Sequence, residues 1–290
     1  MADALENPEP CVLGKLIYQR GPRTVVEHTR SDGQTVVVKF SKCDPRAAIQ
    51  RSEATMQQFA AIHGILTPKV LRVYEIMGEA EPIGRAIVME KVPGIPLVQV
   101  WRRLPEEMQE SIKNQLREQL ALMRALTMPY IGRVGYRPAW NLFNVRQTYA
   151  LGPFPDRELF DEWCLRRIRQ KPARSYTFDM WRFKRHVEKD RAKSTEGRFV
   201  LTHGDLSPRN IMVDDGRITG IIDWQFSGFF PKWVEHANAT VVAAGMETWW
   251  IPVLREVVPK CAKGMSKLAF EIEEHPDYSY GDEKYFALDD

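Results

Sequence analysis

The most informative segment of this sequence is Val200-Leu201-Thr202-His203-Gly204-Asp205-Leu206-Ser207-Pro208-Arg209-Asn210-Ile211, continued by Ile221-Ile222-Asp223-Trp224. Three oxygen-bearing side chains stand out among its apolar residues: Asp205, Asn210 and Asp223. Residues 211–213 and 218–222 read as two short strands, and Asp215-Gly216 between them as a two-residue turn. The stretch therefore predicts a β-hairpin with polar side chains at its open end.

The turn also sets a register for this hairpin. It predicts three pairs of facing residues: Asp214 with Arg217, Asn210 with Ile221, and Asp223 with Pro208. Asn210 and Asp223 then lie on opposite strands with an offset of two residues, roughly 7–8 Å apart. Magnesium takes oxygen ligands and keeps further positions for water and phosphate, so one ion is expected between these two side chains. The alternative is an ordinary hairpin whose ends happen to be polar.

Composition places the chain among ordinary globular proteins. It has a net charge of +3, with 44% hydrophobic and 27% charged residues. Its 290 residues are enough for one large domain or two lobes. The four cysteines form no CxxC motif, so they predict reduced thiols without a disulfide framework or metal site. The first residues lack the pattern of a signal peptide, and no apolar run approaches the ~18 residues of a membrane span. We therefore expect a cytoplasmic protein without a membrane partner.

The N-terminal part predicts an antiparallel sheet that carries a lysine. Strands are expected at residues 12–18, 24–28 and 35–40, separated by turns rich in glycine and proline. Val38 and Phe40 are expected in the core, so the side chain of Lys39 should point to the opposite face, toward a cleft. A lysine in a partly dry cleft needs a carboxylate partner, and Glu53 in a helix expected at residues 46–63 is the candidate. The alternative is that both charges are solvated surface residues.

A proline- and glycine-rich segment marks the predicted domain boundary. Two further strands are expected at residues 70–75 and 85–90, and Lys91-Val92-Pro93-Gly94-Ile95-Pro96 then ends the sheet. We place the domains at residues 1–92 and 93–290. A hinge here offers the carbonyl of Glu90 and the amide of Val92 to an adenine edge, whereas Pro93 has no N–H to donate. The alternative is a plain linker.

The second part of the chain has mainly helical patterns. Residues 109–126 predict an amphipathic helix with one buried stripe: Ile112, Leu116, Leu120, Met123 and Leu126. Residues 163–193 are strongly basic with interleaved aromatics; because no RNA- or DNA-binding motif accompanies them, a solvated helix face is favoured over a nucleic-acid surface. Another helix is expected at residues 233–250. The last twenty residues are acidic and could line a site for a cationic substrate, but a solvated or disordered terminus is the favoured interpretation.

The order of these features resembles the protein-kinase-like fold of the aminoglycoside phosphotransferase family, in particular its fungal-type uncharacterised subgroup. Asp205 and Asn210 have the interval of the kinase loop H-x-D-x-x-x-x-N, with Gly204 where protein kinases have arginine. The other matching motifs are Gly220-Ile221-Ile222-Asp223-Trp224 in place of D-F-G, Val88-Met89-Glu90-Lys91-Val92-Pro93-Gly94, and Leu151-Gly152-Pro153-Phe154. The resemblance implies an α+β fold with two lobes, an antiparallel sheet in the N-terminal lobe and a mainly helical C-terminal lobe.

The same resemblance implies a small-molecule kinase that uses ATP and Mg²⁺ and phosphorylates a hydroxyl group. The implied roles are these: Asp205 is the catalytic base; Asn210 and Asp223 hold magnesium; Lys39, oriented by Glu53, contacts the phosphates; Glu90 and Val92 meet the adenine; and His203 braces the loop.

Two departures from the family pattern keep other functions open. Gly21-Pro22-Arg23-Thr24 is not a G-x-G-x-x-G loop, and Gln225 stands where the subgroup usually has glutamate. A catalytically weak or inactive kinase-like binding or regulatory protein is therefore the alternative, and a scaffold that contacts RNA through residues 163–193 is a third hypothesis. A protein kinase is disfavoured because there is no A-P-E segment. The acceptor, the choice between ATP and GTP, and the oligomeric state are not predicted.

Overall fold

A computed structural model describes residues 14–20, 23–42, 52–143, 150–169, 173–191, 197–242 and 247–261, together with Met265, Ala269 and Ile272. The chain forms two compact units: unit 1 comprises Met1–Pro45 and Pro68–Lys91, and unit 2 comprises Arg46–Thr67 and Val92–Asp290. The division after Lys91 falls in the proline- and glycine-rich segment. Residues 46–67, expected in the first domain, group with unit 2, and the domain limits given above stay a prediction.

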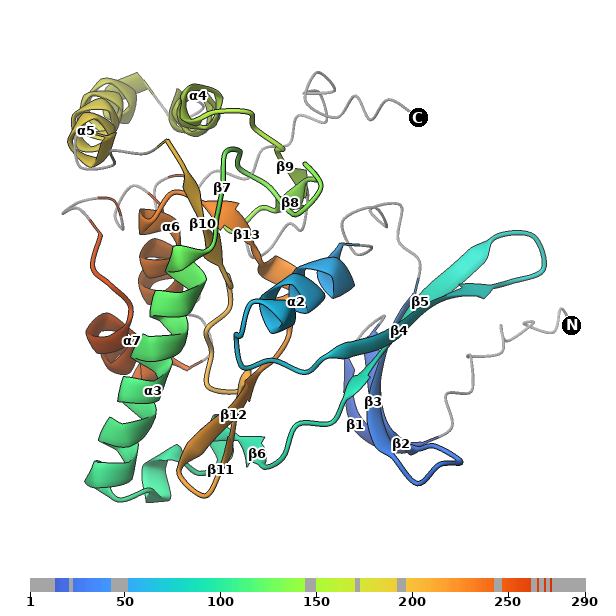
Figure 1. Ribbon diagram of the computed structural model, residues 1–290. Coiled ribbons are helices and arrows are strands. Elements are labelled where there is room, and N and C mark those ends of the chain that lie inside the picture. Colours follow the sequence, from blue (N-terminus) through green and yellow to red (C-terminus); the bar gives the residue numbers. More distant parts are fainter. Residues whose placement is uncertain are drawn as a thin grey trace, which may run out of the picture. The chain divides into compact units, whose positions relative to one another are not determined.

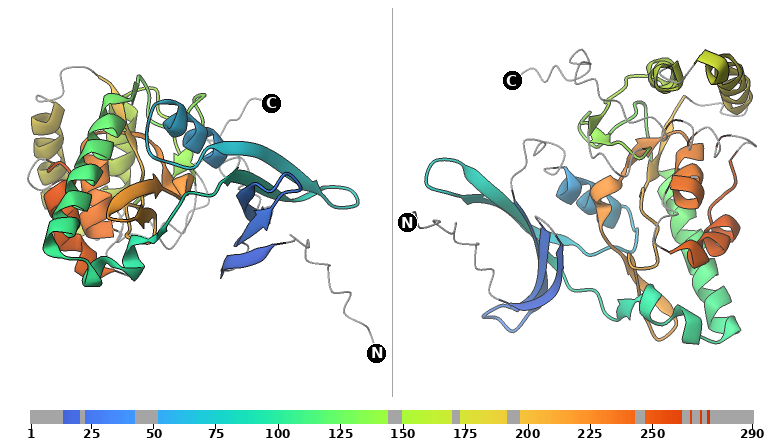
Figure 2. Two further views of the ribbon diagram at one scale, coloured as in Figure 1. Left: turned by 60° about the horizontal axis from the view of Figure 1, so that its bottom comes forward. Right: turned by 180° about the vertical axis from the view of Figure 1, so that it is seen from behind.

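Unit 1 contains one antiparallel sheet of five strands in the order β1-β2-β3-β5-β4, drawn from blue to teal in Figure 2. The strands are β1 Lys15–Arg20, β2 Arg23–Thr29, β3 Thr35–Lys42, β4 Val70–Met77 and β5 Pro82–Glu90. The strands predicted from sequence alternation are all present, with ends shifted by a few residues. Val26, Val36, Val38 and Ala86 form the buried apolar cluster of this sheet. The α+β class with an antiparallel N-terminal sheet is confirmed.

Unit 2 contains the helices and several short strands. The α-helices are α2 Glu53–Ile62, α3 Glu106–Ala125, α4 Arg157–Arg169, α5 Ala173–Arg191, α6 Trp233–Ala237 and α7 Ile251–Val257. The short strands are β6 Ile95–Pro96, β7 Thr127–Met128, β8 Ala139–Trp140, β9 Ala150–Leu151, β10 Phe199–Thr202, β11 Ile211–Asp214, β12 Arg217–Ile221 and β13 Gly228–Phe230. They form three small sheets, β13-β10-β7, β12-β11-β6 and β8-β9. Figure 1 shows α4 and α5 next to each other and α3 running past β10.

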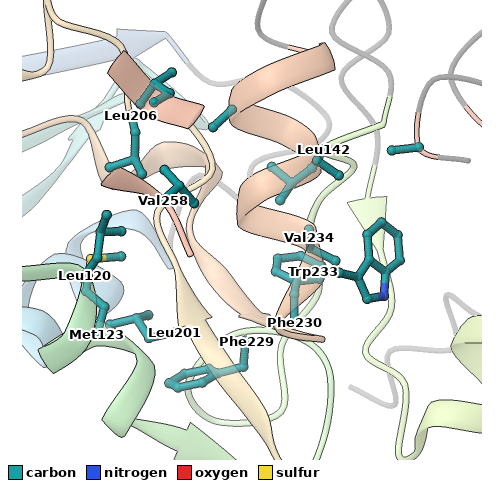
Figure 3. Packing of buried hydrophobic residues seen from close by; sticks show 14 of the residues in the cluster. Leu120, Met123, Leu142, Leu201, Leu206, Phe229, Phe230, Trp233, Val234 and Val258 are labelled. Carbon is teal, nitrogen blue, oxygen red and sulfur yellow. The ribbon is translucent and has the colours of Figure 1, made fainter. Parts of the chain in front are cut away.

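The apolar face of α3 anchors the core of unit 2. Ile112, Leu116, Leu120 and Met123 are at most 1% exposed, so the predicted stripe is confirmed, whereas Leu126 follows the end of the helix and is partly buried. In Figure 3 the side chains of Leu120 and Met123 lie beside Leu201 of β10. The helix thereby supports the strand that leads into the loop at residues 203–210.

The helix predicted at residues 233–250 is interrupted before its end, because Glu247 has a non-helical backbone with φ at −119° and ψ at 64°. After the short helix α6, residues Asn238–Val242 form a π-helical turn, and Thr248–Trp250 form a 3₁₀ turn before α7. The side chain of Asn238 donates to the carbonyl of Gly204 at the start of this irregular part. The winding therefore changes from α- to π-helical where Asn238 turns its side chain toward the 203–210 loop, a tertiary contact that the apolar pattern does not encode.

No helix in the described part of the chain is both long and apolar enough to cross a bilayer. The basic segment 163–193 forms α4 and α5. Among its side chains that are described, Arg167 is buried and stacks on Trp163, with 5.4 Å from the guanidinium carbon to the ring centre, whereas Lys184, Arg185 and Lys189 are exposed or partly so. The hypothesis of RNA contact stays a prediction. The acidic C-terminal tail lies outside the described residues, apart from Ile272.

Candidate active site

The loop of residues 203–210 lies between a buried strand and a hairpin, all within unit 2. Strand β10 is buried throughout and pairs with β13 on one side and β7 on the other. The loop leaves β10 and enters β11, which pairs with β12 as an antiparallel hairpin. On its other edge β11 pairs with β6, the segment that follows the boundary at Lys91. The predicted hairpin is confirmed.

The register of that hairpin differs from the prediction at its open end. Asp214 faces Arg217 as expected, but Ile221 faces Ile211 and not Asn210. The cause is a bulge at Thr219, which adds one residue to β12. The carbonyl of Asn210 consequently accepts from the amide of Ile222 at 2.9 Å. Asn210 is therefore opposite Ile222, and the offset between Asn210 and Asp223 across the two strands is smaller than the two residues predicted.

His203 ties the loop to the end of β12. Its imidazole accepts at Nδ1 from the amide of Asp205 at 3.2 Å and lies 3.1 Å from the carbonyl of Ile222 through Nε2, so a neutral ring with its proton on Nε2 satisfies both contacts. Burial lowers the pKa of His203, in the direction that keeps the ring neutral. One buried imidazole thus spans the segments that carry Asp205 and Asp223, a position from which it can brace the loop.

Glu235 of α6 holds the backbone of the same loop. Its carboxylate accepts from the amide of His203 at 2.6 Å and from the amide of Gly204 at 3.1 Å, and the side chain of Asn238 donates to the carbonyl of Gly204. Glu235 is 3% exposed, and burial raises the pKa of its carboxyl to about 7 although the two amides oppose that shift. Helix α6 and the residue that follows it therefore satisfy both backbone polar groups of Gly204.

Gly204 has a backbone conformation that disfavours any side chain. Its φ is +81°, and a Cβ atom there would lie 2.7 Å from the carbonyl oxygen of Phe226 and 2.8 Å from Cδ2 of Leu142. Figure 3 shows Leu142 in the core beside Trp233 and Val234, which limits its freedom to move. The glycine that replaces the arginine of protein kinases is therefore required by this packing.

We expect Gly204→Ala to lower the free energy of unfolding by about 1–3 kcal/mol, because it adds backbone strain and a contact with fixed atoms. Gly64→Ala is the matched control: Gly64 has a φ of +84°, and a Cβ atom there would meet no other atom within 4 Å, so this variant carries the strain alone. Urea denaturation of both variants measures the difference. Equal losses for the two variants would show that the contact with Phe226 and Leu142 contributes nothing.

Asn210 holds the side chain of Asp205, and Arg209 lies beside it. The side-chain amide of Asn210 donates to Oδ2 of Asp205 at 2.9 Å and to its backbone carbonyl at 3.0 Å. Arg209 places a guanidinium nitrogen 3.3 Å from Oδ1 and 3.2 Å from Oδ2, and its other terminal nitrogen contacts Glu247. Because Asn210 uses its nitrogen as the donor, its Oδ1 is the atom that can face a cation.

Asp223 has a left-handed backbone, with φ at 63° and ψ at 66°, immediately before the 3₁₀ turn Trp224–Phe226. A non-glycine residue in this region stores strain that the surroundings must hold, and such residues concentrate at functional sites. Trp224 supplies part of that support: its ring is fully buried, and its Nε1 donates to Thr67 at 2.8 Å and to the carbonyl of Ile221 at 3.0 Å. The fold thus fixes Asp223 after β12 in a strained conformation.

Arg133 supports the segment that follows Asp223. Its buried guanidinium donates to the carbonyl of Ser227 at 2.9 Å, to the carbonyl of Gln225, and to the hydroxyl of Ser52 at 2.8 Å beside the start of α2. Burial lowers the pKa of Arg133 to about 10, and the nearby Glu53 carboxylate opposes that shift. The backbone carbonyl of Gln225 therefore takes part in this hydrogen-bond network independently of the identity of its side chain.

The other predicted site residues lie in both units. Lys39 is in the middle of the sheet of unit 1, 9% exposed and opposite Val25 and Ile87 on the neighbouring strands. Glu90 ends β5 in the same unit. Glu53 begins α2 in unit 2 and is 6% exposed, so it is not the solvated charge of the alternative. Val92 opens the second part of unit 2 and packs on Gly220 of β12.

Several residues of this site were not predicted from the sequence: Glu235, Arg209, Glu247, Asn238 and Arg133. One signal was available for Glu235, which is a single carboxylate inside the apolar run Trp233-Val234-Glu235-His236-Ala237. A cavity of about 440 Å³ lies elsewhere in unit 2, between α3 and the turn at Asp215-Gly216, and contains no predicted site residue.

Comparison with known proteins places most of the chain in one group. The profile described as the phosphotransferase enzyme family matches residues 22–256. Aminoglycoside 3'-phosphotransferase of Streptomyces fradiae is 25% identical over 231 residues, which cover 75% of each chain.

Solved structures of the same fold include complexes with nucleotides or nucleotide analogues. A thermostable mutant of aminoglycoside phosphotransferase APH(4)-Ia, in a ternary complex with AMP-PNP and hygromycin B, has a TM-score of 0.50 and 14% identity, with 89% of this chain and 82% of that chain covered. A mutant of aminoglycoside 2'-phosphotransferase-IIIa in its GDP complex has a TM-score of 0.53 and 14% identity, with 89% and 80% covered. At these identities the likeness shows the fold.

Proposed function

Because the chain belongs to the phosphotransferase enzyme family, we propose that it transfers the terminal phosphoryl group of ATP, with Mg²⁺, to a hydroxyl group of a small molecule in the cytoplasm. The observation that carries this proposal is the arrangement of Asn210. Its amide nitrogen is bonded to Asp205, which leaves its oxygen for a cation, and its backbone is bonded to the residue before Asp223. Asn210, itself a proposed metal ligand, thereby connects the proposed base through its side chain with the segment of Asp223 through its backbone.

The residues present fit a magnesium ion. Mg²⁺ prefers hard oxygen ligands and is usually bound by one or two carboxylates together with phosphate and water. Asn210 keeps its Oδ1 for a cation, and Asp223 presents a carboxylate from a strained position after β12. When bound, the ion would neutralise charge on the phosphate oxygens.

The residues of this chain then account for the chemical step. The acceptor oxygen attacks the terminal phosphorus, the bond from that phosphorus to the bridging oxygen breaks, and ADP leaves. Oδ2 of Asp205 is held by Asn210, so Oδ1 orients the acceptor hydroxyl and takes its proton. The transition state is loose, so this proton transfer comes late and electrostatics supply most of the acceleration.

The roles of the remaining residues are proposed in the same way. Lys39 contacts the phosphates with Glu53 as its partner, while the Glu90 carbonyl and the Val92 amide meet the adenine. The burial of Lys39 and of Glu53 supports the first of these assignments, because a lysine and a carboxylate with so little exposure each need a compensating partner. The acceptor belongs to the class of small hydroxyl compounds.

The test is nucleotide turnover by the purified chain. Release of ADP or GDP is measured with each nucleoside triphosphate, with Mg²⁺ and again with EDTA, against a panel of hydroxyl metabolites and aminoglycosides. We expect turnover with Mg²⁺ and at least one acceptor, and none with EDTA.

Isothermal titration decides between this function and its alternative. Nucleotide binding with Mg²⁺ accompanies the enzyme, whereas no measurable affinity for either nucleotide, together with no turnover, would contradict it and favour the binding or regulatory protein without catalysis.

A further inference from the structure

The guanidinium of Arg209 is shared unequally between two carboxylates. Its NH1 nitrogen lies 2.8 and 2.6 Å from the two oxygens of Glu247, and its NH2 nitrogen lies 3.3 and 3.2 Å from the oxygens of Asp205. Hydrogen bonds between such charged groups are typically about 2.7–2.9 Å long. Arg209 is therefore anchored on Glu247 and touches Asp205 only loosely.

The anchor belongs to a segment that is fixed on the loop at a second point. Glu247 precedes the 3₁₀ turn Thr248–Trp250, and Nε1 of Trp250 donates to the carbonyl of Leu206 at 3.0 Å. The side chain of Glu247 is 16% exposed, that of Asp205 13% and that of Arg209 39%. The two carboxylates are thus held in place, while the arginine between them has the most freedom to move.

We propose that Glu247 is a positioning residue that tethers Arg209 and prevents its guanidinium from closing on Asp205. This inference rests on the proposed function. An arginine pairs with a carboxylate best through two parallel hydrogen bonds, which occupy both oxygens. Such a pair on Asp205 would cover Oδ1, the oxygen that Asn210 leaves for the acceptor proton. Glu247 keeps the positive charge near the base and keeps that oxygen accessible.

This arrangement predicts that removing Arg209 restores the kcat lost in Glu247→Gln, and that the effects of the two substitutions on kcat do not multiply. Glu247→Gln releases Arg209 toward Asp205, and we expect kcat to fall about tenfold, which corresponds to about 1.4 kcal/mol of added ground-state stabilisation. Arg209→Gln removes the group that covers the base, and Asn210 still holds Oδ2. We expect the double variant to recover the kcat of Arg209→Gln alone, within about threefold of the wild type.

The experiment measures ADP release from Mg–ATP with water as the acceptor, so that it needs no identified substrate. It compares the wild type, Glu247→Gln, Arg209→Gln, the double variant and Asp205→Ala. The KM for Mg–ATP is expected to stay unchanged in the first three variants, because the pair touches the base and not the proposed nucleotide ligands. Glu256→Gln is the matched control, since Glu256 forms a 2.6 Å ion pair with Lys113 away from the loop. Thermal unfolding of each variant separates folding defects from catalytic ones.

The outcomes distinguish this inference from the function beneath it. Restoration of kcat in the double variant supports the tether. Losses that multiply in the double variant, or a Glu247→Gln enzyme with the kcat of Glu256→Gln, would overturn it while leaving the phosphotransferase intact. A wild type that releases no more ADP than Asp205→Ala would instead contradict the role of Asp205 as the base, and the tether with it.

Discussion

Asp205→Asn is expected to lower kcat by about 10²–10⁴-fold, the range attributed to a positioned general base, with little change in the KM for Mg–ATP. The substituted side chain has the same shape and keeps one oxygen that can accept from Asn210, so the loop keeps its main contact. It cannot take the proton of the acceptor hydroxyl. The loss therefore falls on the chemical step, and steady-state kinetics with the acceptor from the panel will measure it.

Asp214→Asn supplies the control for that variant. Asp214 lies at the exposed far end of β11 and faces Arg217, so the substitution removes the same charge from the hairpin that follows the loop, without touching the loop. It should keep the kcat of the wild type within about twofold, since surface substitutions away from such contacts have small effects. If both variants retained full activity, Asp205 would not be the base.

The local features of this fold were predictable from sequence because they depend on neighbouring residues. Alternating side chains produced the strands of unit 1, and the spacing of apolar residues produced the buried stripe of α3. The Asp215-Gly216 turn correctly paired Asp214 with Arg217, the residues that flank it. The loop at residues 203–210 could be found because Asp205 and Asn210 hold each other directly within one short segment.

The errors arose where distant segments decide the local geometry. The bulge at Thr219 shifts the hairpin by one residue, and its hydroxyl donates to the carbonyl of Pro93 at 2.7 Å, which lies 126 positions earlier in the chain. Nothing in the sequence of the hairpin requires that bulge. Similarly, the helix expected at residues 233–250 changes from α- to π-helical winding where Asn238 reaches Gly204. The spacing of apolar residues predicts which face of a helix is buried. It does not predict which polar side chain forms a hydrogen bond with a distant loop.

Roles assigned to single charged residues were the hardest to derive. Arg209 and Glu247 are separated by 38 positions in the chain, and either one alone reads as a surface charge. The role proposed for Arg209 and Glu247 depends on their contacts around Asp205, which exist only in the folded loop. The same holds for Arg133, whose hydrogen bonds to Ser52, Gln225 and Ser227 join the start of α2 to the segment after Asp223. Buried charges of this kind are visible only once their partners are known.

Glu235→Ala is expected to be the most destabilising substitution in unit 2 that we consider. It leaves the amides of His203 and Gly204 without their acceptor, and each buried unsatisfied donor costs about 1–3 kcal/mol, so we expect a loss of about 2–6 kcal/mol in the free energy of unfolding. Denaturation in urea measures that loss. Activity should fall as well, because the same two amides fix the backbone that carries Asp205.

The raised pKa of Glu235 adds a pH dependence whose sign can be derived. Burial raises this pKa from 4.5 to about 7, so between these values the folded chain binds more protons than the unfolded chain. The contribution of this group to stability is therefore fully present below pH 4.5 and is lost as the pH rises to about 7, a change of about 3 kcal/mol.

Glu235→Gln cannot titrate and keeps one acceptor oxygen, so its stability should lack this decline. The difference between wild type and Glu235→Gln, measured by urea denaturation from about pH 4.5 to about pH 7.5, cancels the carboxylates that both proteins share. A difference that stays constant over this range would show that the two amide hydrogen bonds outweigh burial and keep Glu235 ionised throughout.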